Sequence, residues 1–341
     1  MYVGLGDGAV CAICRLKIAA FHHIFFANGI TEISTDTTRI FVDFGAELDS
    51  ENSADPFGIE GVTVGESRCD GIFFTHYHND HIGLMGTIND DIPIYMGDVA
   101  KGIVEILAKR LAKQFANAPN NYGYNLKTVS RLKTFEAARP IKVGDITVTP
   151  FSVDHSAYDA YMFLIEADGK RILHTGDFRV HGFRGIALGK MLQKYIGHVD
   201  ILICEGTNVS GNKGSVLCGN ASTVPETELS ERFKKVFAEN KYVFLLCSST
   251  NADRIASALK ALPQERYMIC DGYQKTIAEY ITKTAGKRSG YYRIDRLVCY
   301  NEKLHEKMLK NGFCVLVRKG NPFHRAIMEK FKFKDPIILY S

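Results

Sequence analysis

One stretch of nine residues, 75–83 (THYHNDHIG), constrains the fold and chemistry of this chain more than any other. It follows the apolar run 72–74 and contains three imidazoles and a carboxylate: His76, His78, Asp80 and His81. Imidazole and carboxylate are the usual ligands of zinc and related ions, and alternate residues on an irregular turn can face two neighbouring ions. The alternative is a polar loop that is rich in histidine by chance, but four ligand-type residues in this order after a strand favour metal binding. We therefore expect a dinuclear metal site.

Further candidate ligands follow two other predicted strands. The run 147–153 precedes Asp154 and His155, and the run 171–175 precedes Gly176 and Asp177. A sheet presents functional residues on the loops beyond its strand ends, and glycine lets the backbone turn tightly there. A lone histidine or aspartate is more often a satisfied polar residue than a ligand, so His155 and Asp177 become candidates only as part of the whole set.

These residues resemble a known family, the metallo-β-lactamase fold hydrolases, through His-x-His-x-Asp-His at 76–81, the later His155 and His-Thr-Gly-Asp at 174–177. The resemblance implies an αββα sandwich with the metals at one sheet edge. It implies that His76, His78 and His155 hold one metal. Asp80 and His81 would hold a second, and Asp177 would bridge the two. The implied cofactor is one or two Zn²⁺ ions, with Mn²⁺ as the other candidate. Lactamases, thioester hydrolases, lactonases and nucleases share this motif, so it does not identify the substrate.

Two further segments favour nucleic acid as the substrate. The run 201–204 ends at Glu205 and looks like the acidic motif that opens the β-CASP region of nucleic-acid-processing members. The run 243–247 precedes a turn similar to the Ser/Asn/Arg phosphate-binding turn of the ribonuclease J group, with the candidate residues Ser248, Ser249, Asn251 and Arg254. Hydroxyls, an amide and a guanidinium at the start of a predicted helix suit an anion. An ordinary helix cap by Thr250 or Asn251 explains the turn equally well.

Charge is distributed unevenly along the chain. Residues 207–341 contain 23 Lys and Arg against 13 Asp and Glu, whereas residues 1–206 contain 19 against 25. Phosphate backbones bind to basic surfaces, with an affinity that falls steeply with salt. Lys283, Lys287 and Arg288 lie near the stacking candidates Tyr291 and Tyr292. Most charge runs are merely solvated faces, so the imbalance supports RNA binding without proving it.

The chain is long enough for two domains with sizeable cores, since it has 341 residues of which 46% are hydrophobic. We expect an α/β protein, with a metallo-β-lactamase domain at 1–206, a partial β-CASP domain with a parallel sheet at 207–341, and a hinge within 208–222. Predicted strands of the first domain are 38–44, 72–74, 92–96, 146–153, 162–167, 171–175 and 201–204, with one helix at 98–115. The second domain alternates helices at 226–240, 250–261, 273–284, 302–311 and 322–331 with strands at 243–247, 266–269 and 313–317.

Nothing in the sequence indicates a membrane or secreted protein. No apolar run approaches the roughly 20 residues that span a bilayer. The first twenty residues lack a clean signal-peptide pattern, because Asp7 precedes the apolar stretch and Arg15 and Lys17 interrupt it. The nine cysteines are scattered and odd in number, which suggests reduced thiols. Cys11 and Cys14 form a Cys-x-x-Cys pair, but the sequence has no second such pair to complete a zinc site. We expect a cytoplasmic protein without a membrane partner.

Two segments depart from the ribonuclease J pattern. Such proteins carry a His-x-Ser-Gly-His motif and a last metal-binding histidine after the β-CASP insert, whereas this sequence closes with PIILYS at 336–341. That ending resembles the strand on which the chain would return to the first domain, and His305 and His324 fall in predicted helices. Residues 1–29 show little of the strand and glycine-rich turn that usually open the family. These departures predict a truncated chain with a weakened second metal and poor turnover.

The sequence thus predicts a metal-dependent hydrolase that cleaves phosphodiesters of single-stranded RNA by attack of a metal-bound hydroxide. Asp80 or Asp177 would orient the hydroxide, His174 would support the ligands from behind, and Glu205 would brace the catalytic edge. One alternative is a thioester or lactone hydrolase that uses the same metals. Another is a catalytically weak or inactive RNA-binding remnant, which an unfilled second metal site would favour. Self-association of the chain is left open.

Overall fold

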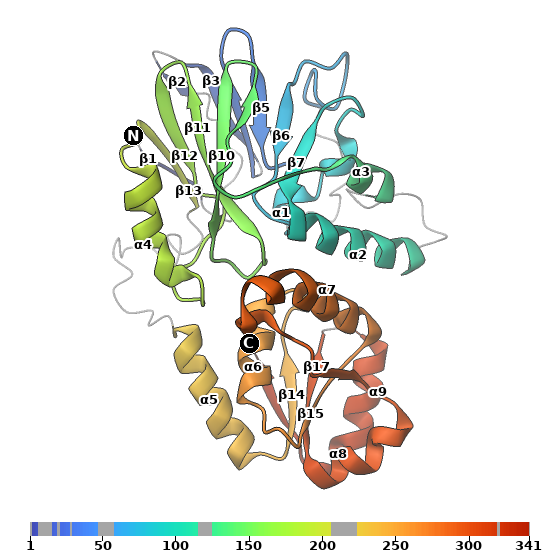
Figure 1. Ribbon diagram of the computed structural model, residues 1–341. Helices are drawn as coiled ribbons and strands as arrows, with labels where there is room; N and C mark the ends of the chain where they lie inside the picture. The colour runs from blue at the N-terminus through green and yellow to red at the C-terminus, as the bar shows by residue number, and fades with distance from the viewer. Residues whose placement is uncertain are drawn as a thin grey trace, which may run out of the picture. The chain divides into compact units, whose positions relative to one another are not determined.

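The computed structural model describes residues 2–5, 16–18, 21–27, 29–46, 58–114, 125–205, 224–318 and 321–340. These residues form two compact units (Figure 1). The first contains the described residues up to Val180 and from Ala187 to Glu205, and the second contains His181–Ile186 and the described residues from 224 onward. The predicted hinge at 208–222, the proposed boundary at 206 and the pair Cys11 and Cys14 lie outside the described residues.

The first unit is built on two sheets. One has the strand order β1 (Tyr2–Leu5), β13 (Ile201–Glu205), β12 (Lys170–His174), β11 (Ala160–Ala167), β10 (Ile146–Val153) and β9 (Ile141–Val143). The other has the order β2 (Leu16–Ile18), β3 (Phe21–Ala27), β4 (Ile30–Ser34), β5 (Arg39–Val42), β6 (Gly71–Phe73), β7 (Ile94–Gly97) and β8 (Lys133–Phe135). Both sheets mix parallel and antiparallel neighbours, for example β5 parallel to β6 and β10 antiparallel to β11.

Strand β11 shows why these sheets pack together. It is apolar on both faces, and alternate residues of a strand point to opposite sides. One face joins a core that both sheets share and that includes Phe163, Ile165, Val42 and Phe73. The other face packs against a helical segment, in a cluster that includes Met162, Leu164 and Leu192. Each fully buried Phe or Ile side chain contributes roughly 1.5–3 kcal/mol, so this arrangement stabilises both layers at once.

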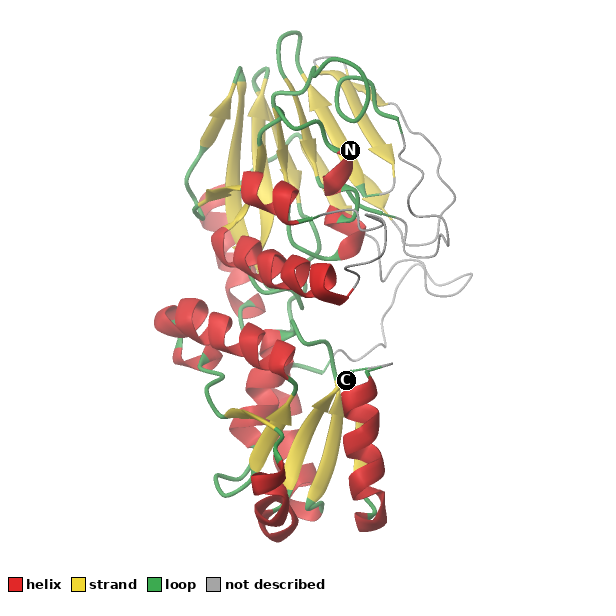
Figure 2. Ribbon diagram, turned by 90° about the vertical axis from the view of Figure 1, so that its right-hand side faces the viewer, coloured by secondary structure: helices red, strands yellow, loops and turns green. Residues whose placement is uncertain are grey.

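Helices cover the outer faces of the two sheets in the first unit (Figures 1 and 2). They are α1 (Asn79–Ile82), α2 (Asp98–Gln114), α3 (Leu126–Arg131) and α4 (Leu188–Met191), with a short turn η1 (Met85–Thr87) and a π-helical turn η3 (Leu192–Ile196). The turn η2 (Gly185–Ala187) falls where the chain passes from the second unit back to the first. Asn125 caps α3, and the Asp159 carboxylate accepts a hydrogen bond from Ala100 N at the start of α2. The unit is therefore the αββα sandwich that the sequence predicted.

The second unit has one parallel sheet, also as predicted. Its order is β16 (Leu297–Cys299), β15 (Tyr267–Cys270), β17 (Phe313–Val317), β14 (Tyr242–Leu246) and β18 (Ile337–Tyr340). The connections contain α5 (Glu226–Glu239), α6 (Ala252–Ala261), α7 (Gly272–Arg288), α8 (His305–Asn311) and α9 (Pro322–Phe331), and the turns η4 (Gly290–Tyr292), η5 (Glu302–Leu304) and η6 (Lys332–Lys334). None of the helices in the described part of the chain combines the length and the apolar character needed to cross a bilayer.

One prediction about this unit was wrong. The closing segment does not form a strand that returns to the first domain, because β18 pairs in parallel with β14 in the second sheet. Val243 lies opposite Ile337, and Leu246 lies opposite Tyr340. Strand β14 pairs with β17 on one side only, so its other side accepts β18, which the chain reaches from α9 after the short turn η6. The expectation that residues 1–29 have little of the family's opening strand was also wrong, because β1, β2 and β3 lie there. Other elements that the sequence failed to predict include β4, β8, β9, α3 and β16.

The start of α7 leads to a prediction about pH. Asp271 caps the helix, since its Oδ1 accepts from Gln274 N at 2.8 Å and its Oδ2 accepts from the Arg318 guanidinium. Burial alone would raise the pKa of Asp271, but the bond from Gln274 N and the Arg318 charge lower it overall. A carboxyl whose folded-state pKa is depressed stabilises the fold above its unfolded pKa, and the contribution is lost as the pH falls through the folded value.

Asp271→Asn is therefore expected to lower the free energy of unfolding at pH 7, because asparagine caps a helix nearly as well but carries no charge for Arg318. The difference from the parent protein should disappear at acid pH, where the Asp271 carboxyl is protonated. Urea unfolding followed by circular dichroism at several pH values measures both effects, with the exposed Asp295→Asn as control. If the free energy of unfolding of Asp271→Asn stays equally far below that of the parent protein in acid, the role assigned to the Asp271 charge is contradicted.

Candidate metal centre

The candidate ligands lie on loops and a short helix that follow the strand ends of both sheets in the first unit. His76 and His78 follow β6, and Asp80 and His81 are in α1, directly beyond them. His155 and Asp177 follow β10 and β12 of the other sheet. Because the two sheets share a core, these loops meet at one edge of the sandwich, where a rigid framework positions functional side chains.

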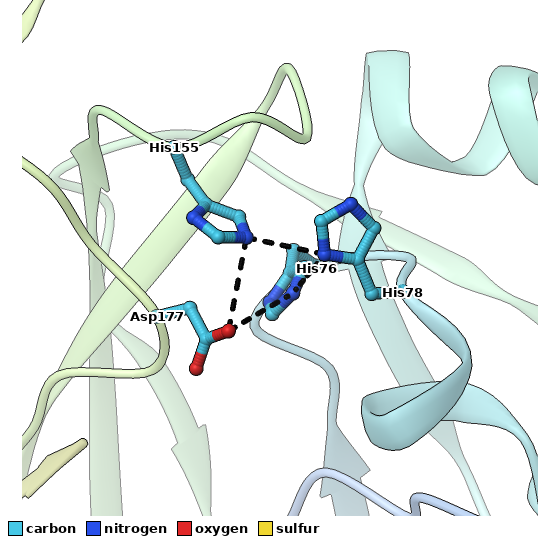
Figure 3. Close-up of side chains that lie close together, drawn as sticks. All are labelled: His76, His78, His155 and Asp177. Carbon is cyan, nitrogen blue, oxygen red and sulfur yellow. Dashed lines mark hydrogen bonds and ion pairs between the residues drawn. The ribbon is translucent and has the colours of Figure 1, made fainter. Parts of the chain in front are cut away.

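Four side chains converge in a first cluster: His76, His78, His155 and Asp177 (Figure 3). The Nδ1 atom of His78 lies 3.1 Å from Nε2 of both His76 and His155. The Asp177 Oδ2 atom lies 3.8 Å from His76 Nε2 and 3.7 Å from His155 Nε2. The four ligand atoms lie within 4.8 Å of one another, so one cation could contact them all.

A second cluster adjoins the first and shares one residue with it. His81 Nε2 lies 3.5 Å from Asp80 Oδ2 and 3.4 Å from Asp177 Oδ1. Asp177 therefore directs Oδ2 to the first cluster and Oδ1 to the second, which is the arrangement of a bridging carboxylate. The structure thus brings together all six side chains that the sequence singled out as ligands.

Hydrogen bonds behind the ligands orient two of the imidazoles. Thr75 Oγ1 donates to Asp43 Oδ2 at 2.7 Å, so it accepts from Nδ1–H of His76 at 3.0 Å. Asp43 Oδ2 also accepts from His81 Nδ1 at 2.8 Å. The His76 ring therefore presents its Nε2 lone pair to the first cluster, and the Nε2 atom of His81 faces the carboxylates of the second. A carboxylate behind a histidine ligand orients the ring and raises its basicity, so this donor set fits a divalent metal such as zinc.

Burial keeps the imidazoles of the first cluster neutral. It lowers the pKa of His76 well below the usual value, lowers that of His78, and lowers that of His155 to about 3. Neutral imidazole is the form that binds a metal, so no proton has to leave these rings before binding at neutral pH.

The second cluster has the opposite electrostatics. Burial would lower the pKa of His81, but the charge of Asp43 and the carboxylates of Asp177 and Asp80 raise it well above the usual value. For the Asp177 carboxyl, burial would raise the pKa, but the hydrogen bond to His81 lowers that pKa overall. The cluster is thus a concentration of negative charge around one imidazole, which a divalent cation would neutralise.

Asp43 is a functional residue that the sequence reasoning missed. It is buried, has φ 60°, and accepts from both the backbone N and the side-chain oxygen of Thr75, at 2.7 Å each. The available signal was an acid directly after β5, but a single aspartate beyond a strand carries no spacing pattern. Only its contacts with Thr75 and His81 reveal that it supports the ligand loop.

His174 and Glu205 contact the loop that carries Asp177. His174 Nδ1 accepts from Gly176 N at 3.2 Å, so its Nε2–H donates to Thr31 Oγ1 at 3.1 Å. Glu205 Oε1 accepts from the backbone N of Phe178, one residue beyond Asp177, at 2.7 Å. These contacts are those of residues that hold a loop in place, and their predicted catalytic roles stay predictions.

The turn after β14 forms a helix cap in this structure. Asn251 Oδ1 accepts from Arg254 N at 3.2 Å, which is the capping interpretation of the segment. The Arg254 side chain donates to the buried Glu226 at 3.2 Å, and Ser248 Oγ lies 3.0 Å from Thr250 Oγ1. Ser249 is buried. Phosphate binding by Ser248, Ser249, Asn251 and Arg254 stays a prediction, and the Nε atom of Arg254 is already bonded to Glu226.

The stacking candidates are occupied by contacts within the second unit. Tyr292 is buried, and its hydroxyl donates to Asp253 Oδ1 at 2.8 Å. The Tyr291 ring stacks on Phe183 with centroids 4.0 Å apart, and the Lys260 Nζ atom lies 3.9 Å from the Tyr291 centroid. A base would have to displace these groups, so in this conformation neither tyrosine offers the open face that was expected.

Known proteins are similar to this chain in sequence and in fold. The family model described as the beta-lactamase superfamily domain matches residues 38–243. The chain is 28% identical over 190 residues to a probable ribonuclease, RNase MJ4, of Methanocaldococcus jannaschii, which is 52% of this chain and 41% of that protein. It is 23% identical over 240 residues to ribonuclease J of Helicobacter pylori, 67% of this chain and 32% of that protein. Ribonuclease J of Mycoplasma genitalium is 23% identical over 270 residues, 72% of this chain and 43% of that protein.

This chain spans less than half the length of each of these three relatives. Among solved structures, a protein of unknown function from Enterococcus faecalis has a similar fold, with a TM-score of 0.65 and 19% identity. The match covers 91% of this chain and 84% of that one. At this identity the likeness supports the fold alone.

Proposed function

Because the chain belongs to the beta-lactamase superfamily and is similar in sequence to ribonuclease J, we propose that it is a metal-dependent hydrolase of RNA phosphodiester bonds. The observation that supports the proposal most is the pair of ligand clusters joined by Asp177. Zn²⁺ is the proposed cofactor, with Mn²⁺ as the alternative. The second unit, with its parallel sheet, is proposed to be the β-CASP region, and 1–206 and 207–341 are kept as the proposed domains.

The residues of the site suit hydrolysis at neutral pH. Divalent ions at such a centre supply Lewis acidity toward a phosphoryl oxygen and activate water. His76, His78 and His155 would hold the first ion, and Asp80 and His81 the second. The Asp80 and Asp177 carboxylates, whose pKa values lie below the usual range, can accept a hydrogen bond from the attacking water and orient it.

RNA is proposed as the substrate because the relatives are named ribonucleases and because the sequence from residue 207 onward is basic. Single-stranded RNA is favoured, and binding should weaken as the salt concentration rises. The cytoplasm as the location stays a prediction from the sequence, and self-association stays open.

One observation favours a second candidate, an RNA-binding protein with weak or absent catalysis. Within the described residues the second cluster has three ligand residues, one of them shared, against four in the first. A metal held by fewer donors binds less tightly, so the second ion could be lost first. The third class, a thioester or lactone hydrolase, uses the same clusters and is tested by the choice of substrate.

The test is metal content per chain together with cleavage of a 5′-labelled RNA, with and without added Zn²⁺ or Mn²⁺. We expect two metals and salt-sensitive cleavage, and we expect His76→Ala to lose the first metal and to reduce cleavage to background, because His76 is a fully buried ligand. His198→Ala, which replaces an exposed histidine outside both clusters, should leave metal content and cleavage unchanged. One metal or none, with RNA binding but no cleavage, would favour the second candidate. Hydrolysis of a thioester or lactone but not of RNA would favour the third.

A further inference from the structure

Tyr77 lies between two candidate metal ligands in the sequence, and its side chain reaches the loop that carries a third. It lies between His76 and His78 and is only 4% exposed. Its hydroxyl accepts a hydrogen bond from the backbone N of Tyr158 at 2.9 Å. Tyr158, itself 8% exposed, is three residues beyond His155 on the loop that follows β10. A single side chain thus connects the loop of two ligands to the loop of the third.

The connection matters because the three imidazoles of the first cluster come from different sheets. His76 and His78 follow β6 in the seven-stranded sheet, whereas His155 follows β10 in the six-stranded sheet. Hydrogen bonds between the two regions include Tyr161 N to Thr75 O at 2.9 Å, which joins two backbones and would form with almost any residue. The bond from Tyr158 N depends on the hydroxyl of Tyr77 and is therefore specified by this sequence.

We propose that Tyr77 is a positioning residue that holds His155 at the first metal site, an inference that rests on the proposed metal centre. The Tyr158 N–H is buried, and a buried donor that loses its acceptor costs free energy, so the loop would shift to find another partner. His155 would then have to be ordered when the metal binds. Loss of a group that orients a metal ligand typically lowers metal affinity about 10–100-fold.

The first test compares Zn²⁺ affinity of the full chain by competition with a chelator. Tyr77→Phe removes the hydroxyl and keeps the ring that fills the core, so the fold should persist. We expect the first Zn²⁺ to bind about 10–100-fold more weakly in this variant. Tyr242→Phe is the matched control, because it removes a hydroxyl that donates to Leu309 O at 2.8 Å in the second unit. Its Zn²⁺ affinity should equal that of the parent protein.

A double-mutant cycle separates positioning from a general loss of stability. If Tyr77 acts through His155, then Tyr77→Phe should weaken Zn²⁺ binding in the parent protein but cause no further loss in a His155→Ala background. An equal loss in both backgrounds would overturn the proposal, as would an unchanged affinity of Tyr77→Phe. The absorption spectrum of the Co²⁺-substituted protein gives a second readout, since a displaced His155 changes the coordination of the ion.

Failure of this inference is distinguishable from failure of the proposed function. A parent protein that binds no Zn²⁺ or Co²⁺ would refute the metal centre itself and the inference with it. A parent protein that binds metal while Tyr77→Phe binds it equally well would refute only the role of Tyr77. Neither measurement requires RNA cleavage.

Discussion

Asp177→Asn is expected to abolish hydrolysis and to leave one bound metal ion at most. Among the described residues Asp177 alone belongs to both ligand clusters, and it directs one carboxylate oxygen to each. Asparagine keeps the shape of the side chain but replaces one oxygen by an NH₂ group, which is a hydrogen-bond donor and cannot bind a cation. One cluster therefore loses a ligand, and the negative charge between the two sites disappears as well.

Metal content per chain and cleavage of labelled RNA measure this effect together. The matched control is Asp168→Asn, the same chemical change at an exposed turn residue with φ 48°, a conformation that asparagine adopts readily. The control should retain full metal content and rate. Two tightly bound metals in Asp177→Asn, with a rate near that of the parent, would show that Asp177 does not bridge the sites.

Gly45→Ala should have the second large effect, although Gly45 is not itself a ligand. A Cβ atom at this position would lie 1.5 Å from the carbonyl oxygen of Asp80 and 3.0 Å from the backbone N of His81. These are backbone atoms, which cannot swing aside as a flexible side chain can. Helix α1 would have to move away, and Asp80 and His81 would move with it.

Hydrogen bonds oppose that movement. Phe44 N donates to His81 O at 2.7 Å, Ala46 N donates to Asn79 O at 3.2 Å, and Leu84 N donates to Phe44 O at 3.0 Å. Forcing extra atoms into such a contact costs about 3 kcal/mol or more, the upper end of the range for overpacked sites. We therefore expect a lower free energy of unfolding together with loss of the second metal.

Urea unfolding and metal content test this prediction. The matched control is Gly189→Ala, since Gly189 is exposed in α4 and a Cβ atom there would meet nothing within 4 Å. Alanine at that position should leave stability equal or slightly higher, because glycine is the poorer helix residue. Normal stability and full metal content in Gly45→Ala would contradict the close approach of the two backbone segments.

Local patterns in the sequence were sufficient to predict the parts of the protein that local physics controls. The histidines and the aspartate at 76–81, which follow the apolar run 72–74, indicated the chemistry of the loop without knowledge of the fold. Elements with a clear period, such as β10 and α2, were confirmed, because a period of two or of 3.6 reflects which side faces a core. The continuous apolar run of β14 was also confirmed as a buried strand. Short elements such as β8 and β16 have three residues each and carry no measurable period.

Contacts between distant residues were beyond that reasoning. Asp43 supports His81 across 38 positions of the sequence, and Tyr77 meets the backbone of Tyr158 across 81. Arg254, which looked free to bind a phosphate, pairs instead with Glu226. The closing strand joins β14 rather than the first domain, since the available strand edge, and not the apolar sequence of the strand, selects its partner.

The sequence by itself therefore determined which side chains can bind metal and which family the chain resembles, because ligand chemistry is a property of each residue type and of its local spacing. The tertiary structure alone decided how those side chains converge, which oxygen of Asp177 faces which cluster, and which residues support them from behind. Those features depend on two sheets packing over a shared core. That packing brings Asp43, Tyr77 and His155 into place through bonds that no local pattern encodes.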